Sequence, residues 1–179
     1  MSKDRAVPNI AELVGEYHRA VYRYAFRLSG STTDAEDLTQ QAFLVAQQKL
    51  DQLRKPESAR SWLFTILRNC FLRDRRRPTP LLAGSLGLNI DSVPAEVPRK
   101  GDIDTELLQE ALNELPEKFR LMLVMFYFED CSYREIAKKL DLPIGTVMSR
   151  LARAKGYLRS KLLESAEKGK GQRGQAAAK

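Results

Sequence analysis

Residues 132–163 read SYREIAKKLDLPIGTVMSRLARAKGYLRSKLL, and this stretch decides the fold of the C-terminal half. Ser132 and Glu135 stand at the spacing of a capping box, which predicts that a short helix begins there. Pro143 cannot donate a backbone hydrogen bond, so that helix ends in a tight turn. Apolar residues then recur at helical spacing from Ile144 to Leu163. A short helix, a tight turn and a longer helix together predict a helix-turn-helix. The expected buried side of the longer helix consists of Ile144, Val147, Leu151, Ala154, Leu158 and Leu162.

Opposite this apolar stripe, the longer helix carries polar and basic side chains in its N-terminal half. Arginine can bond guanine through two hydrogen bonds, and serine or threonine can bond base edges or phosphates, so this face suits readout of the major groove. A solvated helix face is the alternative. The capped first helix, the proline turn and the further cations Lys155, Arg159 and Lys161 favour DNA reading. The outward residues are Thr146, Ser149, Arg150 and Arg153.

The sequence before this motif predicts more helices and a break in the chain. Apolar periodicity indicates helices at 105–115 and 117–128, separated by Pro116. Prolines and glycines concentrate in residues 78–101, a composition typical of a flexible linker. Residues 167–179 are low in complexity and predict a disordered basic tail. The second domain therefore spans residues 102–166.

Residues 1–77 predict a separate helical domain. Helices are expected at 10–28, ending at Gly30, from Thr33 to about residue 50, with a capping box over Thr33 to Glu36, and from 58 to about 76. Three antiparallel helices around one core are the economical arrangement. The fold class is therefore all-α, with two small helical domains joined by a linker. The first helix is expected to bury Leu13, Val14, Tyr17, Val21, Tyr24, Ala25 and Leu28.

The third helix and the residues around it combine basic and aromatic side chains. Such surfaces suit unpaired nucleic-acid bases, which stack on rings and bond to amides while cations follow the backbone. Trp62 has a second interpretation, because its spacing with Ile66 and Cys70 also explains it as core packing. The residues concerned are Arg54, Lys55, Arg60, Trp62, Arg68, Asn69, Arg73, Arg75, Arg76 and Arg77.

The second helix differs in charge, with carboxylates in its first turn followed by glutamines. Carboxylates at a helix N-terminus stabilise it through the helix dipole. A protein-docking face is an equally good interpretation, because amide side chains can bond a partner helix without burying charge. The residues alone leave both interpretations open. The candidates are Asp34, Asp37, Gln40 and Gln41.

Composition narrows the classes of function. The 179 residues carry a net charge of +7 and a pI near 9.5, which favours a polyanionic partner, with nucleic acid ahead of an anionic membrane. No signal peptide or bilayer-spanning run is evident, so we expect a soluble, cytoplasmic protein without a membrane partner. The lone His18 and the two cysteines form no nucleophile motif or metal-ligand cluster. We therefore expect no catalytic residues, metal or cofactor, and a chain that is not an enzyme.

Several blocks occur in a characteristic order: DAEDLTQQAF at 34–43, WLFTILRN at 62–69, LPEKFR at 115–120, YREIA at 133–137 and GTVMSRLARA at 145–154. In this order they resemble the extracytoplasmic-function (group 4) RNA polymerase sigma factors of the sigma-70 family. The resemblance implies promoter-specific transcription initiation, with residues 1–77 similar to sigma region 2 and residues 102–166 similar to region 4.

The resemblance also implies partners and site residues. Core RNA polymerase would bind through the clamp helices of its largest subunit and the flap of its second-largest subunit, and an anti-sigma factor would hold the chain inactive. Clamp docking would use Asp34, Asp37, Gln40 and Gln41. The melted minus-ten element would contact Arg60, Trp62, Asn69, Arg73, Arg76 and Arg77. The minus-thirty-five duplex would contact Ser132, Tyr133, Thr146, Ser149, Arg150 and Arg153.

Two departures from the family pattern affect promoter preference. Arg73 stands where many members carry an acidic residue, and Met148 stands where Lys or Arg is common. The promoter sequence is therefore not transferable from other members. A stand-alone helix-turn-helix regulator, which would bind duplex DNA as a dimer without polymerase, is the main alternative.

Overall fold

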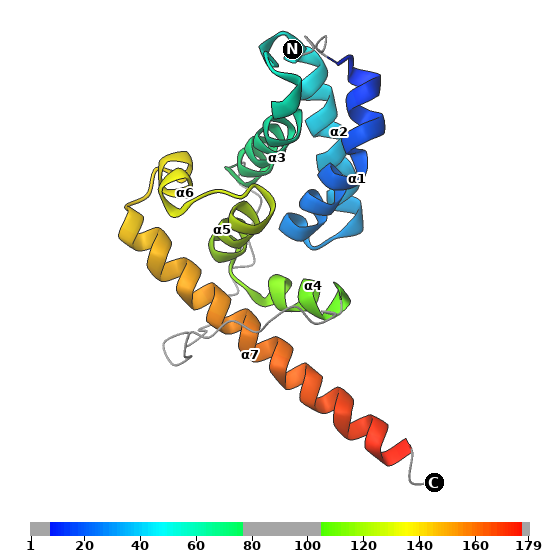
Figure 1. The fold of residues 1–179 in the computed structure, drawn as a ribbon, viewed down its shortest axis with the longest axis vertical. Helices are drawn as coiled ribbons and strands as arrows, with labels where there is room; N and C mark the ends of the chain where they lie inside the picture. The colour runs from blue at the N-terminus through cyan, green and yellow to red at the C-terminus, as the bar shows by residue number, and fades with distance from the viewer. Residues whose placement is uncertain (1–7, 77–104, 177–179) are drawn as a thin grey trace, which may run out of the picture. The chain divides into compact units, whose positions relative to one another are not determined.

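The computed structural model describes residues 8–76 and 105–176. All regular elements of these residues are helices, which confirms the predicted all-α class (Figure 1). The chain divides into two compact units, one on each side of residue 85. The predicted linker at 78–101 lies outside the described residues.

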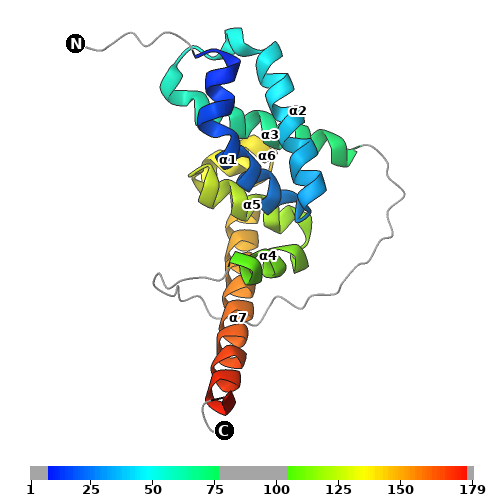
Figure 2. The same ribbon diagram turned by 90° about the vertical axis from the view of Figure 1, so that its right-hand side faces the viewer.

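Unit 1 contains α1 (Ile10–Ser29), α2 (Thr32–Gln48) and α3 (Ala59–Arg76), with two short 3-10 turns, Leu50–Gln52 and Pro56–Ser58, before α3. Helix α1 packs along α2, and α3 packs against both (Figure 2). Tyr24 and Phe64 stack in the core with ring centroids 4.7 Å apart and planes at 6°. Apolar residues on one stripe of each helix form this core, as their spacing predicts.

Local capping signals fix the ends of these helices. Asn9 and Glu12 form a capping box at the start of α1. Gly30 ends α1 in the left-handed conformation with φ of 76°, which glycine adopts without a Cβ clash. The predicted capping box at Thr33 is wrong. Ser31 is extended and its Oγ accepts the Asp34 amide at 3.3 Å, so Thr33 already lies in the first turn of α2.

Unit 2 contains α4 (Thr105–Glu114), α5 (Glu117–Phe128), α6 (Tyr133–Leu140) and α7 (Ile144–Ala176). Helix α7 runs past α4, α5 and α6 and packs against all three (Figure 2). The core between them is made of fully or almost fully buried apolar side chains. These include Met122, Leu123, Met125, Ile136, Val147, Leu151 and Ala154.

The turn between α6 and α7 forms the predicted helix-turn-helix. Asp141 adopts a left-handed conformation with φ of 52°, which aspartate tolerates better than most residues. The Leu142 amide donates to the Ala137 carbonyl at 2.9 Å and closes α6. The Pro143 carbonyl accepts the amides of Thr146 and Val147 at 3.0 and 3.2 Å. Pro143 therefore stands immediately before α7, where the missing N–H group of proline interrupts no helical hydrogen bond.

Three expectations about packing and length are wrong. Val14 and Ile144 were expected inside, but they are 36% and 44% exposed. Helical spacing puts each on an apolar stripe, but burial requires a neighbouring element at that point. Helix α7 was expected to end near Leu163, before a disordered tail at 167–179, but it continues to Ala176. Glutamate, lysine, glutamine and alanine favour helix there, and glycine weakens a helix without clashing with it.

Both cysteines, Cys70 and Cys131, are buried free thiols. Burial raises the pKa of Cys70 and of Cys131. Both thiols also have polar partners. Cys131 Sγ donates to the Glu129 carboxylate at 3.6 Å and accepts from Lys139 Nζ at 3.0 Å, and Cys70 Sγ accepts from the Arg73 guanidinium at 3.9 Å.

Candidate nucleic-acid interface

The outward face of α7 brings the four predicted residues together. At about 100° per residue, Thr146, Ser149, Arg150 and Arg153 fall within an arc of about 100°. Ser149 and Arg153 are exposed, and Thr146 and Arg150 are half-buried. The Ser149 hydroxyl donates to the Thr146 carbonyl at 3.1 Å, so its oxygen can act as an acceptor toward a ligand. This face could present guanidinium and hydroxyl groups to a groove of DNA.

The N-terminus of α6 is built around the capping box of Ser132 and Glu135. Ser132 Oγ accepts the Glu135 amide at 3.3 Å, and the Glu135 carboxylate accepts the Ser132 amide at 2.8 Å and its hydroxyl at 2.7 Å. Hydrogen bonds from the Ser132 side chain and backbone lower the pKa of Glu135. The donors of Ser132 are thus occupied within the chain.

Not every cation expected on the DNA side is directed to a ligand. Lys161 forms an ion pair with Glu114 of α4 at 2.7 Å, and the Tyr157 hydroxyl donates to the same carboxylate. These contacts join α4 to α7. Lys161 is therefore engaged in an ion pair at the surface of unit 2, between side chains that are 38% and 48% exposed.

Helix α3 carries the other predicted nucleic-acid residues, but these residues do not all lie on the same side of the helix. Trp62, Asn69 and Arg73 lie on one strip, within about 40° of each other at about 100° per residue. Arg60 lies roughly 160° from Trp62 on the same scale, with its guanidinium 5.2 Å from the Phe64 ring centroid. Asn69 and Arg73 are exposed. The strip thus combines an amide, a cation and a ring, without Arg60.

Trp62 and Arg68 show where packing competes with binding. Trp62 is half-buried and packs against the buried residues Leu13, Leu53 and Ala59, which supports the packing interpretation for most of its ring. Arg68 is only 4% exposed, so it cannot follow a nucleic-acid backbone. Arg76 belongs to the last turn of α3, and Arg77 lies outside the described residues.

The four predicted docking residues lie along α2. Asp34, Asp37 and Gln40 are exposed, and Gln41 is half-buried. The Gln41 Oε1 atom is buried without a hydrogen-bond partner among the described residues. Leu44 projects from the same side of α2, where it is 54% exposed among these polar groups. Sequence analysis missed it, although a leucine off the buried stripe is the signal that could have identified it.

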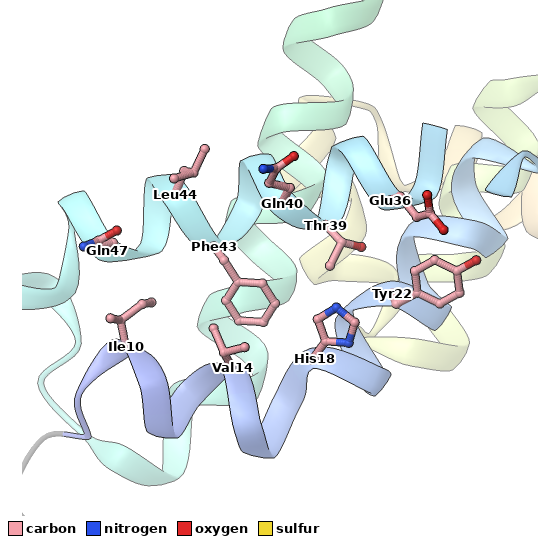
Figure 3. Close-up of a pocket in the computed structure, with 10 residues that line it drawn as sticks. All are labelled: Ile10, Val14, His18, Tyr22, Glu36, Thr39, Gln40, Phe43, Leu44 and Gln47. Atoms are coloured by element: carbon pink, nitrogen blue, oxygen red, sulfur yellow. The ribbon is translucent and has the colours of Figure 1, made fainter. Parts of the chain in front are cut away.

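A groove of about 670 Å³ runs between α1 and α2 beside this face (Figure 3). Phe43 points toward Val14 across the groove, and the ring of His18 stacks on Phe43 with centroids 6.2 Å apart and planes at 9°. His18 is exposed. The buried Thr39 Oγ1 has no hydrogen-bond partner among the described residues. The lining residues are Ile10, Val14, His18, Tyr22, Glu36, Thr39, Gln40, Phe43, Leu44 and Gln47.

The described residues contain no group of three or more His, Cys, Asp or Glu side chains arranged to hold a metal ion. Within the same ranges, no helix has the length and apolar character needed to cross a membrane.

Comparison with known proteins matches both units. Residues 13–79 match the family model for sigma-70 region 2, and residues 105–158 match that for sigma-70 region 4. The chain is 40% identical over 162 residues to the ECF RNA polymerase sigma factor SigE of Mycolicibacterium smegmatis, covering 88% of this chain and 63% of that protein. It is 34% identical to the ECF sigma factor SigL of Mycobacterium tuberculosis, covering 85% of this chain and 88% of SigL.

A solved structure is similar as well. The sigma factor RpoE of Bartonella quintana, in complex with the anti-sigma factor NepR, matches with a TM-score of 0.63 and 30% identity. The match covers 85% of this chain and 95% of that one.

Proposed function

This chain belongs to the extracytoplasmic-function sigma factors of the sigma-70 family, which direct promoter-specific transcription initiation with RNA polymerase, and we propose that its two units divide that task. It is not an enzyme in its own right. Unit 1 docks on the polymerase and holds the melted minus-ten strand, and unit 2 reads the minus-thirty-five duplex. The proposal places the chain in the cytoplasm, with the bacterial chromosome.

The observation that carries the docking proposal is the exposed Leu44 within the acidic and amide face of α2. An apolar side chain ringed by Asp37, Gln40 and Gln41 suits a partner helix, because burial of the leucine adds affinity while the polar groups fix orientation. The clamp helices of the largest polymerase subunit are the proposed partner.

The nucleic-acid proposals follow from the strip on α3 and from the outward face of α7. Asn69 and Arg73 on α3 combine an amide for an unpaired base with a cation for the adjacent phosphate. Arg150 and Arg153 on α7 are placed for base edges of the minus-thirty-five duplex, with Tyr133 at the start of α6 against the backbone. The flap of the second-largest subunit is the proposed polymerase contact of unit 2.

An anti-sigma factor is a further proposed partner. The similar RpoE is in complex with the anti-sigma factor NepR, and we extend this type of partner to the present chain by analogy. A partner that covers the α2 face would compete directly with polymerase.

The deciding experiment combines a pull-down of bacterial core RNA polymerase by the purified chain with run-off transcription on a genomic promoter library. We expect binding and selective initiation, which also identifies the preferred promoter. No polymerase binding, together with specific binding of duplex DNA by the chain alone as a dimer, would replace the proposal by a stand-alone regulator.

A further inference from the structure

Lys155 lies at a junction of three aromatic rings in unit 2. Its ammonium nitrogen is 3.8 Å from the ring centroid of Phe126 and 5.6 Å from the centroids of Tyr127 and Tyr133. It also donates a hydrogen bond to the Tyr133 hydroxyl at 3.4 Å. Phe126 stacks on Tyr133 with centroids 5.5 Å apart and meets Tyr127 edge-on at 5.0 Å. This aromatic junction joins α5, α6 and α7 through one cation.

The direction of Lys155 separates it from the DNA-reading face. Two residues along a helix correspond to a rotation of about 200°, so Lys155 points away from the side on which Arg153 lies. Lys155 is half-buried, whereas Arg153 is exposed. From the sequence alone, Lys155 was grouped with the cations that favour DNA reading. Its charge is instead directed to aromatic faces, where ring quadrupoles attract it.

We propose that Lys155 is a positioning residue for duplex recognition, which fixes Tyr133 and the N-terminus of α6 against α7 without contacting DNA itself. The inference rests on the proposed role of unit 2 in reading the minus-thirty-five element. Tyr133 is the first residue of α6, so the aromatic junction sets where that helix end meets the sugar-phosphate backbone. One lysine thereby couples the placement of α6 to that of the recognition helix α7.

The test uses holoenzyme assembled from core RNA polymerase and the full chain, with binding to a promoter duplex measured by fluorescence anisotropy at several salt concentrations. Lys155→Met keeps an unbranched apolar chain and removes the charge. We expect it to weaken binding about two- to thirtyfold, the range of a lost cation–π contact. The slope of log affinity against log salt stays unchanged, because no phosphate contact is lost. Lys155→Arg is the matched control that keeps a cation over Phe126, and we expect near wild-type binding.

Two results would overturn the proposal. A slope reduced by about one unit in the methionine variant would make Lys155 a phosphate contact. Unchanged binding by the same variant would remove any role in recognition. Failure of the wild-type holoenzyme to bind the promoter would instead count against the proposed function itself, so the two failures are distinguishable.

A double-mutant cycle tests the route through Tyr133. We expect Tyr133→Phe to weaken binding in the wild-type chain and to have a smaller effect in the Lys155→Met background, because both changes break the same contact. Additive effects would show that the two residues act independently and would refute the positioning role. Thermal unfolding monitors the fold of each variant, and Lys155→Gln replaces the methionine variant in both measurements if the latter unfolds.

Discussion

Replacing Leu44 by alanine isolates the docking contribution of the α2 face. The side chain is 54% exposed in unit 1, so the substitution removes little of the core. Burying a whole leucine side chain contributes about 1.5–3 kcal/mol. A partner that covers the exposed half therefore gains about 0.8–1.6 kcal/mol from it, by the same area argument. We expect Leu44→Ala to weaken binding of core RNA polymerase about four- to fifteenfold.

The assay is a titration of the fluorescently labelled chain with core RNA polymerase. Leu163→Ala is the matched control, because Leu163 is a leucine of comparable exposure, 46%, to which no binding role is assigned. We expect the control to bind within twofold of the wild-type chain, and both variants to unfold near the wild-type temperature. Wild-type affinity for the Leu44 variant, or an equal loss in both variants, would refute the assignment of Leu44 to the docking surface.

Three further predictions concern unit 2. Arg153→Ala removes an exposed guanidinium from the α7 face, and we expect it to cost about 1–3 kcal/mol in promoter binding. Run-off transcription from a minus-thirty-five-dependent promoter measures this loss, and unchanged transcription would contradict the assignment. Leu151→Ala empties a core position that is 1% exposed and is expected to destabilise unit 2 by about 2–5 kcal/mol in chemical unfolding, with a loss below 1 kcal/mol contradicting its place in the core. Hydrogen bonds from Ser132 lower the folded-state pKa of Glu135 below its ordinary value of 4.5. The Glu135 carboxylate therefore contributes to stability above pH 4.5, and this contribution is lost as the pH falls through the folded-state pKa. Glu135→Gln should therefore flatten the acid side of the stability profile measured by circular dichroism, and an acid side identical to that of the wild type would contradict this.

Local signals in the sequence were sufficient for most helix ends. Pro116 precedes α5, and that helix spans the predicted Glu117–Phe128. The Ser132 capping box begins α6 as predicted. Such signals act within one turn of helix, so neighbouring residues contain all the information needed. Thr33 was one exception, because Ser31 offers a competing cap two residues earlier. The C-terminal end of α7 was another, because the helix continues to Ala176.

The exposed face of α7 was predicted from the sequence, and the errors about which cations are available fall where a distant element redirects a side chain. The outward face of α7 follows from helical periodicity, and Ser149 and Arg153 are exposed as predicted. Lys161 was counted as a DNA cation, but Glu114, 47 positions earlier in the chain, pairs with it. The Phe126 ring redirects Lys155 in the same way.

The sequence alone determined the all-helical class, the helix-turn-helix and the resemblance to sigma factors, since periodicity, caps and ordered motifs are properties of neighbouring residues. Tertiary structure decided which apolar groups remain exposed and which cations are available. Leu44 lies open beside the α1–α2 groove, and Arg68 is buried. Burial and pairing depend on which other helix lies opposite a side chain, and the spacing of residues along one helix does not contain that information.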